Sequence, residues 1–271
     1  MNYCYGLKPV RRQPSLRLVD YLRPSDLPAV ESLPAKFGHD LIQPEMFLND
    51  RIGCCAIAGS IEEVRLLNAT RGVTVNFSNQ SVVTNYSAIT GYRPGPELTL
   101  RNAPPNPTDQ GTDVHELFDY RQNTGLVDDG GNRHKVVAYA GLTPGDFGEL
   151  LQALYLFETV GIGILVPDYA QTQFEAGGPW QPLPGRPNIE GGHYIPAVSR
   201  DGASVDIFTW GARIVMTDAF YEKFSNVAVV SFTEEMLTNG KTIDGFDRDK
   251  LLADLPEFNT GPVMSKRKKA A

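Results

Sequence analysis

Two short segments of this 271-residue chain carry side chains that could do chemistry. The first contains two adjacent cysteines, Cys54 and Cys55, directly after Gly53. A proline-rich segment changes to a helical pattern there, so Cys55 is expected to begin a helix, where free N–H groups and the helix dipole favour the thiolate. A cysteine at a helix start is also common as a small buried apolar residue. This segment alone is compatible with Cys55 as a nucleophile and with Cys55 as a packing residue.

The second segment is centred on His193, which follows Gly191 and Gly192 and precedes an apolar run, 194–198. The glycines permit a tight turn and the close approach of a substrate, and His193 is expected to open a strand. A lone histidine in such a place is often structural. Together with Cys55, however, it could form a thiolate–imidazole pair that attacks a carbonyl carbon.

The elements that would position these residues divide the chain into a helical half and a β-rich half. Residues 1–48 are rich in proline and predict an extended arm lying over the fold. Helices are expected from 55 onward and at 81–90, 112–125, 144–160 and 218–224, with Ser81, Thr143 and Thr217 as N-caps. Strands are expected at 135–140, 161–166, 194–199, 204–209, 213–216 and 228–232.

In the order of its cysteine and histidine segments and in the residues around them, the chain resembles the papain superfamily of cysteine peptidases. The resemblance extends from about residue 34 to 232. That family has a glutamine and a Gly-x-Cys run before its nucleophile. Here Asn49 lies six residues before Cys55, and Gly53 lies two before it. The family also has a Gly-His strand start followed by an Asn-x-Trp-Gly element, and here Gly192-His193 is followed by Phe208-Thr209-Trp210-Gly211.

The resemblance implies an α+β, papain-like fold with two lobes and the site in the cleft between them. The helical N-terminal lobe would cover about residues 1–140, and the antiparallel β-barrel-like C-terminal lobe about 141–245. Both belong to one domain, 1–245, followed by a polar tail, 246–271. Cys55 would be the nucleophile, His193 its partner, and Asn49 would take the role of the family's oxyanion-binding glutamine. No cofactor and no metal is implied.

Three positions depart from the family pattern. Asn49 is one methylene shorter than glutamine, Ala56 replaces a tryptophan, and Phe208 stands where the family has the asparagine that orients the histidine. The hydroxyl of Thr209 is the hypothetical replacement for that asparagine. Cys54 is expected to be a packing residue, because the spacing to Gly53 and Asn49 fits Cys55.

Two functions follow from this pattern. The first is a cysteine-dependent hydrolase, a peptidase or amidase, acting on a peptide or protein substrate; a transferase or deamidase would use the same Cys55–His193 pair. The alternative is a weak or inactive papain-like module with a structural or binding role, for example in the protein assembly of a phage particle. Phe208, Asn49 and Ala56 favour this alternative, because all three depart from the enzyme pattern.

The composition limits the partners and the compartment. A net charge of −7 argues against a general nucleic-acid-binding face, and the basic cluster 266–269 is expected to be a solvated tail. No apolar run is long enough for a bilayer, and none of signal-peptide length follows Arg12. Three cysteines, two of them adjacent, cannot form a disulfide framework. A cytoplasmic protein is expected, or a virion-associated one if it is a phage component.

Overall fold

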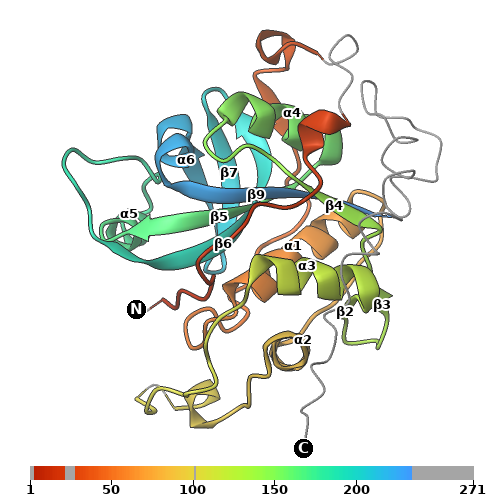
Figure 1. Ribbon diagram of the computed structural model, residues 1–271, viewed down its shortest axis with the longest axis vertical. Helices are drawn as coiled ribbons and strands as arrows, with labels where there is room; N and C mark the ends of the chain where they lie inside the picture. Colours follow the sequence, from red (N-terminus) through yellow and green to blue (C-terminus); the bar gives the residue numbers. More distant parts are fainter. Residues whose placement is uncertain (1–2, 22–27, 101, 234–271) are drawn as a thin grey trace, which may run out of the picture.

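The computed structural model describes residues 3–21, 28–100 and 102–233. It is a mixed α and β structure in which a helical lobe packs under a lobe built on one large antiparallel sheet (Figure 1). The expected α+β fold, with a helical N-terminal lobe and an antiparallel C-terminal lobe, is therefore observed. The expected polar tail, 246–271, with its basic cluster, lies outside the described residues.

In the described part of the chain, the helical lobe contains three α-helices and a small hairpin. Its elements are α1 (Cys55–Ala69), α2 (Asn79–Thr90), α3 (Val114–Asn123), β2 (Leu126–Val127) and β3 (Arg133–His134). A short 3₁₀ helix, Pro96–Leu98, lies in the proline-rich loop between α2 and α3. A hydrophobic core gathers apolar side chains of all three helices around α1.

The second lobe is an open antiparallel sheet in the strand order β4-β9-β5-β6-β7-β8, with β1 added against one end of β6. The strands are β1 (Lys36–Gly38), β4 (Ala138–Gly141), β5 (Val160–Pro167), β6 (Ile189–Asp201), β7 (Ser204–Thr209), β8 (Ala212–Thr217) and β9 (Ser225–Phe232). The helices of this lobe are α4 (Phe147–Phe157), α5 (Ala170–Glu175) and α6 (Asp218–Phe224). Within the described ranges, every strand pair is antiparallel.

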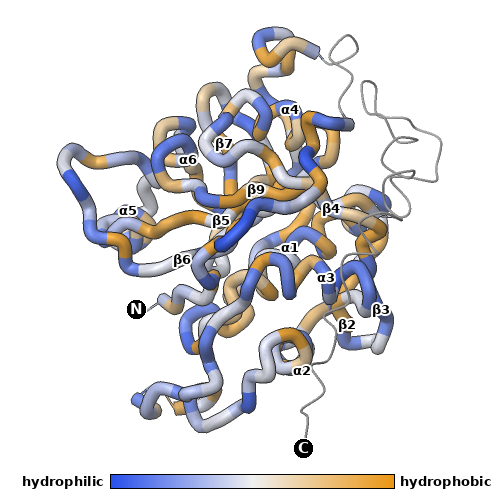
Figure 2. Tube along the Cα trace, in the orientation of Figure 1, coloured by the Kyte–Doolittle hydropathy of each residue, from blue (hydrophilic) through white to orange (hydrophobic). Residues whose placement is uncertain are grey.

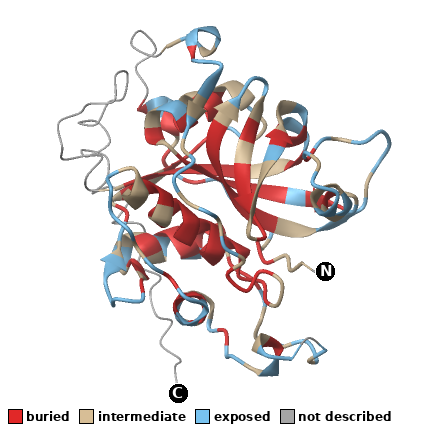
Figure 3. Ribbon diagram, turned by 180° about the vertical axis from the view of Figure 1, so that it is seen from behind, coloured by how far each residue is buried: buried red, intermediate tan, exposed pale blue. Residues whose placement is uncertain are grey.

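The sheet has a hydrophobic core on each of its faces. One core lies between the sheet and the helices α4 and α6, and the other includes Tyr194, Val227 and Val229 of the sheet together with α1. Figure 2 shows β5 mainly in the hydrophobic colour, and Figure 3 shows the buried residues concentrated in α1 and the centre of the sheet. The long helix α1 is thus covered by its own lobe on one side and by the sheet on the other.

A buried polar network fixes α1 against β6. The Tyr194 hydroxyl donates to Glu63 Oε1 at 2.7 Å, and Glu63 Oε2 pairs with Arg121 of α3 at 2.7 Å. A Cβ atom on Gly161 would lie 1.7 Å from the Tyr194 hydroxyl oxygen, so only glycine leaves room for this bond. Because a buried pair is costly to break from one side, the network holds the two lobes in one register.

Several expected boundaries are wrong by a few residues, each for a local reason. Ser78, not Ser81, caps α2, because its Oγ accepts from the N–H of Ser81. Asp146, not Thr143, caps α4, which begins only after the left-handed Gly145. The expected cap at Thr217 and the expected end of α2 at residue 90 are observed.

One wrong boundary concerns the site itself. Strand β6 begins at Ile189, so His193 lies inside the strand and does not open it. The pairing of β5 with β6 continues past Gly191 and Gly192 to Ile189, and this longer pairing extends the strand. His193 is therefore held by neighbours on both sides along the strand, which makes its backbone more rigid than a strand end.

Candidate active site

Cys55 is the first residue of α1 and is completely buried. The turn before it is held by Asp109, whose two carboxylate oxygens accept from the Gly53 N–H at 3.1 and 3.0 Å. The Tyr86 hydroxyl donates to the same carboxylate at 2.6 Å. Asp109 therefore fixes the position of the turn that presents the thiol, a role that the sequence did not indicate.

His193 is also buried, with 1% of its surface exposed. Its Nε2 lies 2.8 Å from Thr209 Oγ1, whereas its buried Nδ1 has no hydrogen-bond partner in the described part of the chain. The ring of Trp210 lies against the imidazole, with centroids 4.9 Å apart and planes at 31°. The imidazole is thus anchored through one nitrogen, and the other is left free.

The thiol and the imidazole come from neighbouring places in the two lobes. The backbone N–H groups of Tyr194, the residue next to His193, and of Gly6 are near enough to the Cys55 sulfur to lower its pKa. Because Nδ1 of His193 has no partner, no hydrogen bond joins the imidazole to the thiol. The structure brings the two residues into one buried region without forming an ion pair between them.

Burial keeps both groups uncharged near neutral pH. It raises the pKa of the Cys55 thiol to about 11, although the backbone N–H groups of Tyr194 and Gly6 oppose this shift. It lowers the pKa of His193 to about 3. Both charged forms are penalised because water is excluded from these two buried positions.

Asn49 lies in a buried turn beside the two cysteines. Phe47 and Leu48, just before it, adopt left-handed backbone angles, with φ of 47° and 65°. Its side-chain Oδ1 is 4.0 Å from Cys54 Sγ, which leaves its Nδ2 available as a donor. Asn49 also lines a cavity of about 10 Å³ together with His193 and Thr209. Since that volume suits about one water-sized group, it could receive a single oxygen atom.

Cys54 is a buried residue on the other side of this turn. Its thiol donates to the carbonyl of Phe47 at 3.1 Å. Burial raises the pKa of Cys54 well above that of a free thiol. These contacts are those of a packing residue.

Phe208 and Thr209 face different surroundings, as neighbouring strand residues should. Thr209 contacts the imidazole, whereas the Phe208 ring packs with Leu66 and Val198 in a small apolar cluster. Phe208 thus fills a core position, and the adjacent Thr209 hydroxyl lies 2.8 Å from the imidazole Nε2. In the described ranges, no group of three or more His, Cys, Asp or Glu side chains could hold a metal ion.

No protein-family model and no curated protein matches the sequence. Solved structures do match the fold. A cysteine protease of Xylella fastidiosa, xylellain, superposes with a TM-score of 0.62 over 86% of this chain and 97% of its own, at 14% identity. The stem bromelain precursor has a TM-score of 0.54 over 86% of this chain and 78% of its own, at 13% identity. The Carica candamarcensis cysteine protease CMS1MS2 has a TM-score of 0.52 over 74% of this chain and 99% of its own, at 13% identity. This chain has the papain-like fold.

In this papain-like fold, an N-terminal arm, residues 3–8, lies between the two lobes. Its backbone is bound on both sides: the Leu7 N–H donates to Gly192 O at 2.9 Å, and the Lys8 N–H donates to Thr112 O at 3.0 Å. Further bonds join Thr112 N–H to Gly6 O at 2.6 Å and Cys4 N–H to Asn49 O at 2.8 Å. The arm therefore covers Cys55 as an added strand would.

Two of the closest contacts of the arm leave room only for glycine. A Cβ atom on Gly6 would lie 1.8 Å from the carbonyl oxygen of Gly53, and one on Gly192 would lie 2.4 Å from that of Leu7. The sequence indicated an extended arm over the fold but not its place in the papain-like cleft. Glycines at both contact points are the one signal that could have predicted such close backbone packing.

In the described residues of this papain-like chain, no helix is both long and apolar enough to cross a membrane.

Proposed function

We propose that this chain is a cysteine-dependent hydrolase that cleaves peptide or amide bonds, with Cys55 as nucleophile and His193 as general base. The observation that carries the proposal is the state of the His193 ring. Its Nε2 lies 2.8 Å from Thr209 Oγ1, and its buried Nδ1 has no hydrogen-bond partner among the described residues, so Nδ1 can accept a proton. The papain-like fold of the chain supports a cysteine hydrolase at the level of the superfamily.

The proposed reaction begins when a substrate replaces the arm. Nδ1 of His193 accepts the thiol proton, and the Cys55 thiolate forms a bond to the substrate carbonyl carbon. The Cys55 backbone N–H and the Asn49 Nδ2 donate to the oxyanion. His193 then gives its proton to the leaving nitrogen as the C–N bond breaks. Water, deprotonated by His193, finally cleaves the thioester and releases the acid and the free thiol.

The arm gives the proposed enzyme a latent state. Cys55 and His193 are buried, and four backbone hydrogen bonds hold residues 4–8 between the lobes. No peptide can reach the thiol while the arm occupies this place. Activity therefore requires the arm to be displaced or removed, which would also rehydrate both groups and move their pKa values back toward the ordinary range.

A structural or binding module, for example in a phage particle, is the second candidate. Two observations favour it. The pair is uncharged, because burial raises the pKa of Cys55 and lowers that of His193. The side chain at position 208 belongs to an apolar cluster and cannot orient the imidazole. In this case the arm would be a permanent part of the core.

A thiol-labelling and turnover experiment separates the two candidates. The parent, Cys55→Ala and Cys54→Ala are incubated with iodoacetamide and with a pool of fluorogenic peptide amides, before and after limited proteolysis of the arm. A hydrolase is expected to show turnover after arm cleavage that Cys55→Ala abolishes and Cys54→Ala retains. If arm cleavage produces neither turnover nor labelling of Cys55 faster than free cysteine, the hydrolase proposal is wrong.

A further inference from the structure

The N-terminal arm is extended, and its side chains alternate between the two lobes. Tyr3, Tyr5 and Leu7 contact residues of the sheet lobe. Cys4 and Gly6, between them, lie against the helical lobe. Alternation of this kind is the pattern of a strand, so every second side chain of a segment bound here meets the sheet lobe.

The ring of Tyr3 lies in a subsite formed by two other aromatic rings. It stacks on Trp210, with centroids 4.5 Å apart and planes at 20°, and it makes an edge contact with Phe174 at 5.2 Å. Phe174 and Trp210 contact each other at 5.0 Å with an angle of 84° between their planes. The two rings therefore form a corner that fits one flat ring, and stacked and edge contacts of this kind favour an aromatic side chain.

The ring of Tyr5 lies in a second subsite, which has polar groups at its far end. Its hydroxyl donates to Glu190 Oε2 at 2.7 Å and accepts from Gln171 Nε2. Its ring lies against His193 and Trp210, with centroids 6.2 Å from each. A carboxylate acceptor and an amide donor at one point match a hydroxyl, which can donate and accept. This subsite therefore suits a tyrosine better than a phenylalanine.

The next residue of the arm passes beside the thiol. The N–H of Gly6 is near enough to the Cys55 sulfur to lower its pKa. A Cβ atom on Gly6 would lie 1.8 Å from the carbonyl oxygen of Gly53, whose N–H is bound by Asp109. From the other side, a Cβ atom on Gly111 would lie 2.2 Å from the carbonyl oxygen of Gly6. This passage accepts a glycine and excludes a residue with a side chain.

Main-chain hydrogen bonds hold the arm on both sides but do not read its sequence. The Leu7 N–H donates to Gly192 O at 2.9 Å, and the Gly6 carbonyl accepts from the Thr112 N–H at 2.6 Å. Any extended peptide could form such bonds, so selectivity comes from the side-chain positions. The two ring subsites and the narrow passage fix a spacing of a ring, one intervening residue, a tyrosine and a glycine.

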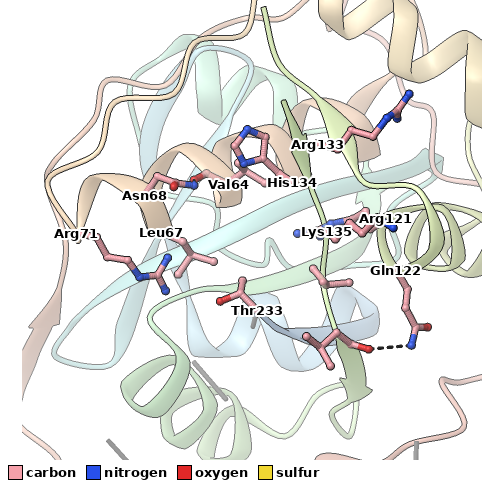
Figure 4. Close-up of a pocket in the computed structure, with 12 residues that line it drawn as sticks. Val64, Leu67, Asn68, Arg71, Arg121, Gln122, Arg133, His134, Lys135 and Thr233 are labelled. Carbon is pink, nitrogen blue, oxygen red and sulfur yellow. Dashed lines mark hydrogen bonds between the residues drawn. The ribbon is translucent and has the colours of Figure 1, made fainter. Parts of the chain in front are cut away.

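The cavity of about 460 Å³ in the helical lobe offers no comparable convergence of side chains. Arg71 and Arg133 lie on opposite sides of it, and Arg133 points away (Figure 4). Its lining includes none of the residues that contact Tyr3 and Tyr5. The cleft is therefore the place where several side chains meet one bound segment.

We propose that the cleft recognises extended peptides with the pattern aromatic-x-Tyr-Gly, bound in the direction of the arm, and that such peptides are the substrate class of the hydrolase. The arm then carries a copy of the pattern that the cleft reads. The assignment of a substrate class rests on the proposed function. The recognition itself does not, because neither ring subsite needs a reaction at Cys55.

Fluorescence anisotropy of a labelled peptide tests the recognition. The probe is Asn-Tyr-Ser-Tyr-Gly-Leu-Lys with fluorescein at its C-terminus, which repeats residues 2–8 with serine in place of cysteine. The full chain is used as Cys55→Ala with Tyr3→Ala, Tyr5→Ala and Gly6→Val, so that the nucleophile is absent and the arm has lost its own contacts in the cleft. We expect this variant to bind the probe, and Cys55→Ala alone to bind it at least tenfold more weakly, because its own arm competes.

Changes in the peptide measure the pattern. Replacing either tyrosine by alanine should weaken binding at least tenfold, and replacing the glycine by alanine should abolish it. Replacing the second tyrosine by phenylalanine should weaken binding several-fold. Adding Glu190→Ala to the protein should weaken the tyrosine peptide by a similar factor and leave the phenylalanine peptide unchanged, because the same hydroxyl contact is lost only once. The matched control is Glu222→Ala, an exposed glutamate of α6, which should bind both peptides unchanged.

Two binding results would overturn the inference: no binding of the probe at millimolar concentration, or binding within threefold of the probe by peptides that lack both rings or the glycine. Turnover separates the inference from the hydrolase proposal, when the same arm substitutions are made with Cys55 retained. Binding with the expected pattern but no cleavage would support the recognition and overturn the hydrolase. Cleavage of unrelated peptides in preference to the pattern would support the hydrolase and overturn this inference.

Discussion

Replacing Gly6 with valine should release the arm from the cleft. The Cβ position on Gly6 lies 1.8 Å from the carbonyl oxygen of Gly53, and the nearest three atoms are all backbone. The Gly53 backbone cannot move away easily, because Asp109 holds its N–H. In Gly6→Val, the arm therefore has to leave its place beside Cys55.

The size of the effect follows from the contacts that would be lost. Three backbone hydrogen bonds flank Gly6: Leu7 to Gly192, Lys8 to Thr112, and Thr112 to Gly6 itself. At about 0.5–1.5 kcal/mol each, they contribute roughly 1.5–4.5 kcal/mol. Burial of the Leu7 side chain, 5% exposed, adds about 1.5–3 kcal/mol. The freed arm regains chain entropy, so the lower end, about 3 kcal/mol, is the useful figure.

A difference of about 3 kcal/mol corresponds to an increase of about 100-fold in the open population. Alkylation of Cys55 should accelerate by at least that factor at pH 7. Opening also removes the burial that raises the pKa of Cys55 to about 11, so the reaction should shift to lower pH as well. Iodoacetamide labelling, read by mass spectrometry of the peptide containing Cys54 and Cys55 in a Cys4→Ser background, measures the rate.

The matched control is Gly178→Val. The nearest atom to a Cβ at Gly178 is 3.6 Å away, and this glycine does not have a positive φ. Its labelling rate should equal that of the parent. A folded Gly6→Val whose Cys55 reacts within threefold of the parent rate would refute the view that the arm closes the site.

Three further substitutions test the site and its surroundings. Thr209→Val should lower turnover after arm removal at least tenfold with unchanged melting temperature, and Thr209→Ser should restore it, if the hydroxyl 2.8 Å from Nε2 orients His193 as proposed. Phe208→Asn should lower the free energy of unfolding by about 3 kcal/mol or more without raising turnover, since a buried ring is lost from an apolar cluster; a more active variant would contradict this. Burial raises the pKa of Glu62 from 4.5 to about 7. Between about pH 4.5 and 7 the folded chain therefore binds more protons than the unfolded chain. The free energy of unfolding falls as the pH rises through that window. Denaturant unfolding should show that Glu62→Gln removes up to about 3 kcal/mol of this loss at pH 8, and an unchanged pH dependence would assign it to another group.

Periodicity and turn residues were enough to predict the order of helices and strands. Strand 204–209 and helix 218–224 were predicted with the observed bounds, because both are short and Thr217 caps the helix. The first residue of α1 was also predicted, at the point where an extended segment meets a helical pattern. Such local features are encoded within a few residues.

Contacts between distant segments could not be predicted in the same way. The place of the arm depends on Gly192 and Thr112, which lie far along the chain from Leu7. The true start of β6 depends on its pairing with Pro167 of β5. The link from Asp109 to Gly53 joins a proline-rich loop to the turn before Cys55. Each is decided by tertiary packing and leaves only weak local signals.

The aromatic stack beside His193 provides an optical signal for the state of the cleft. The chain contains two tryptophans, and the rings of Trp180 and Trp210 are 5.6 Å apart. Tyr3, on the arm, stacks on Trp210 with centroids at 4.5 Å. When the arm leaves, Trp210 loses this cover and meets water, while Trp180 stays fully buried. The intrinsic fluorescence of the unlabelled protein therefore reports, in real time, whether the site beside it is open.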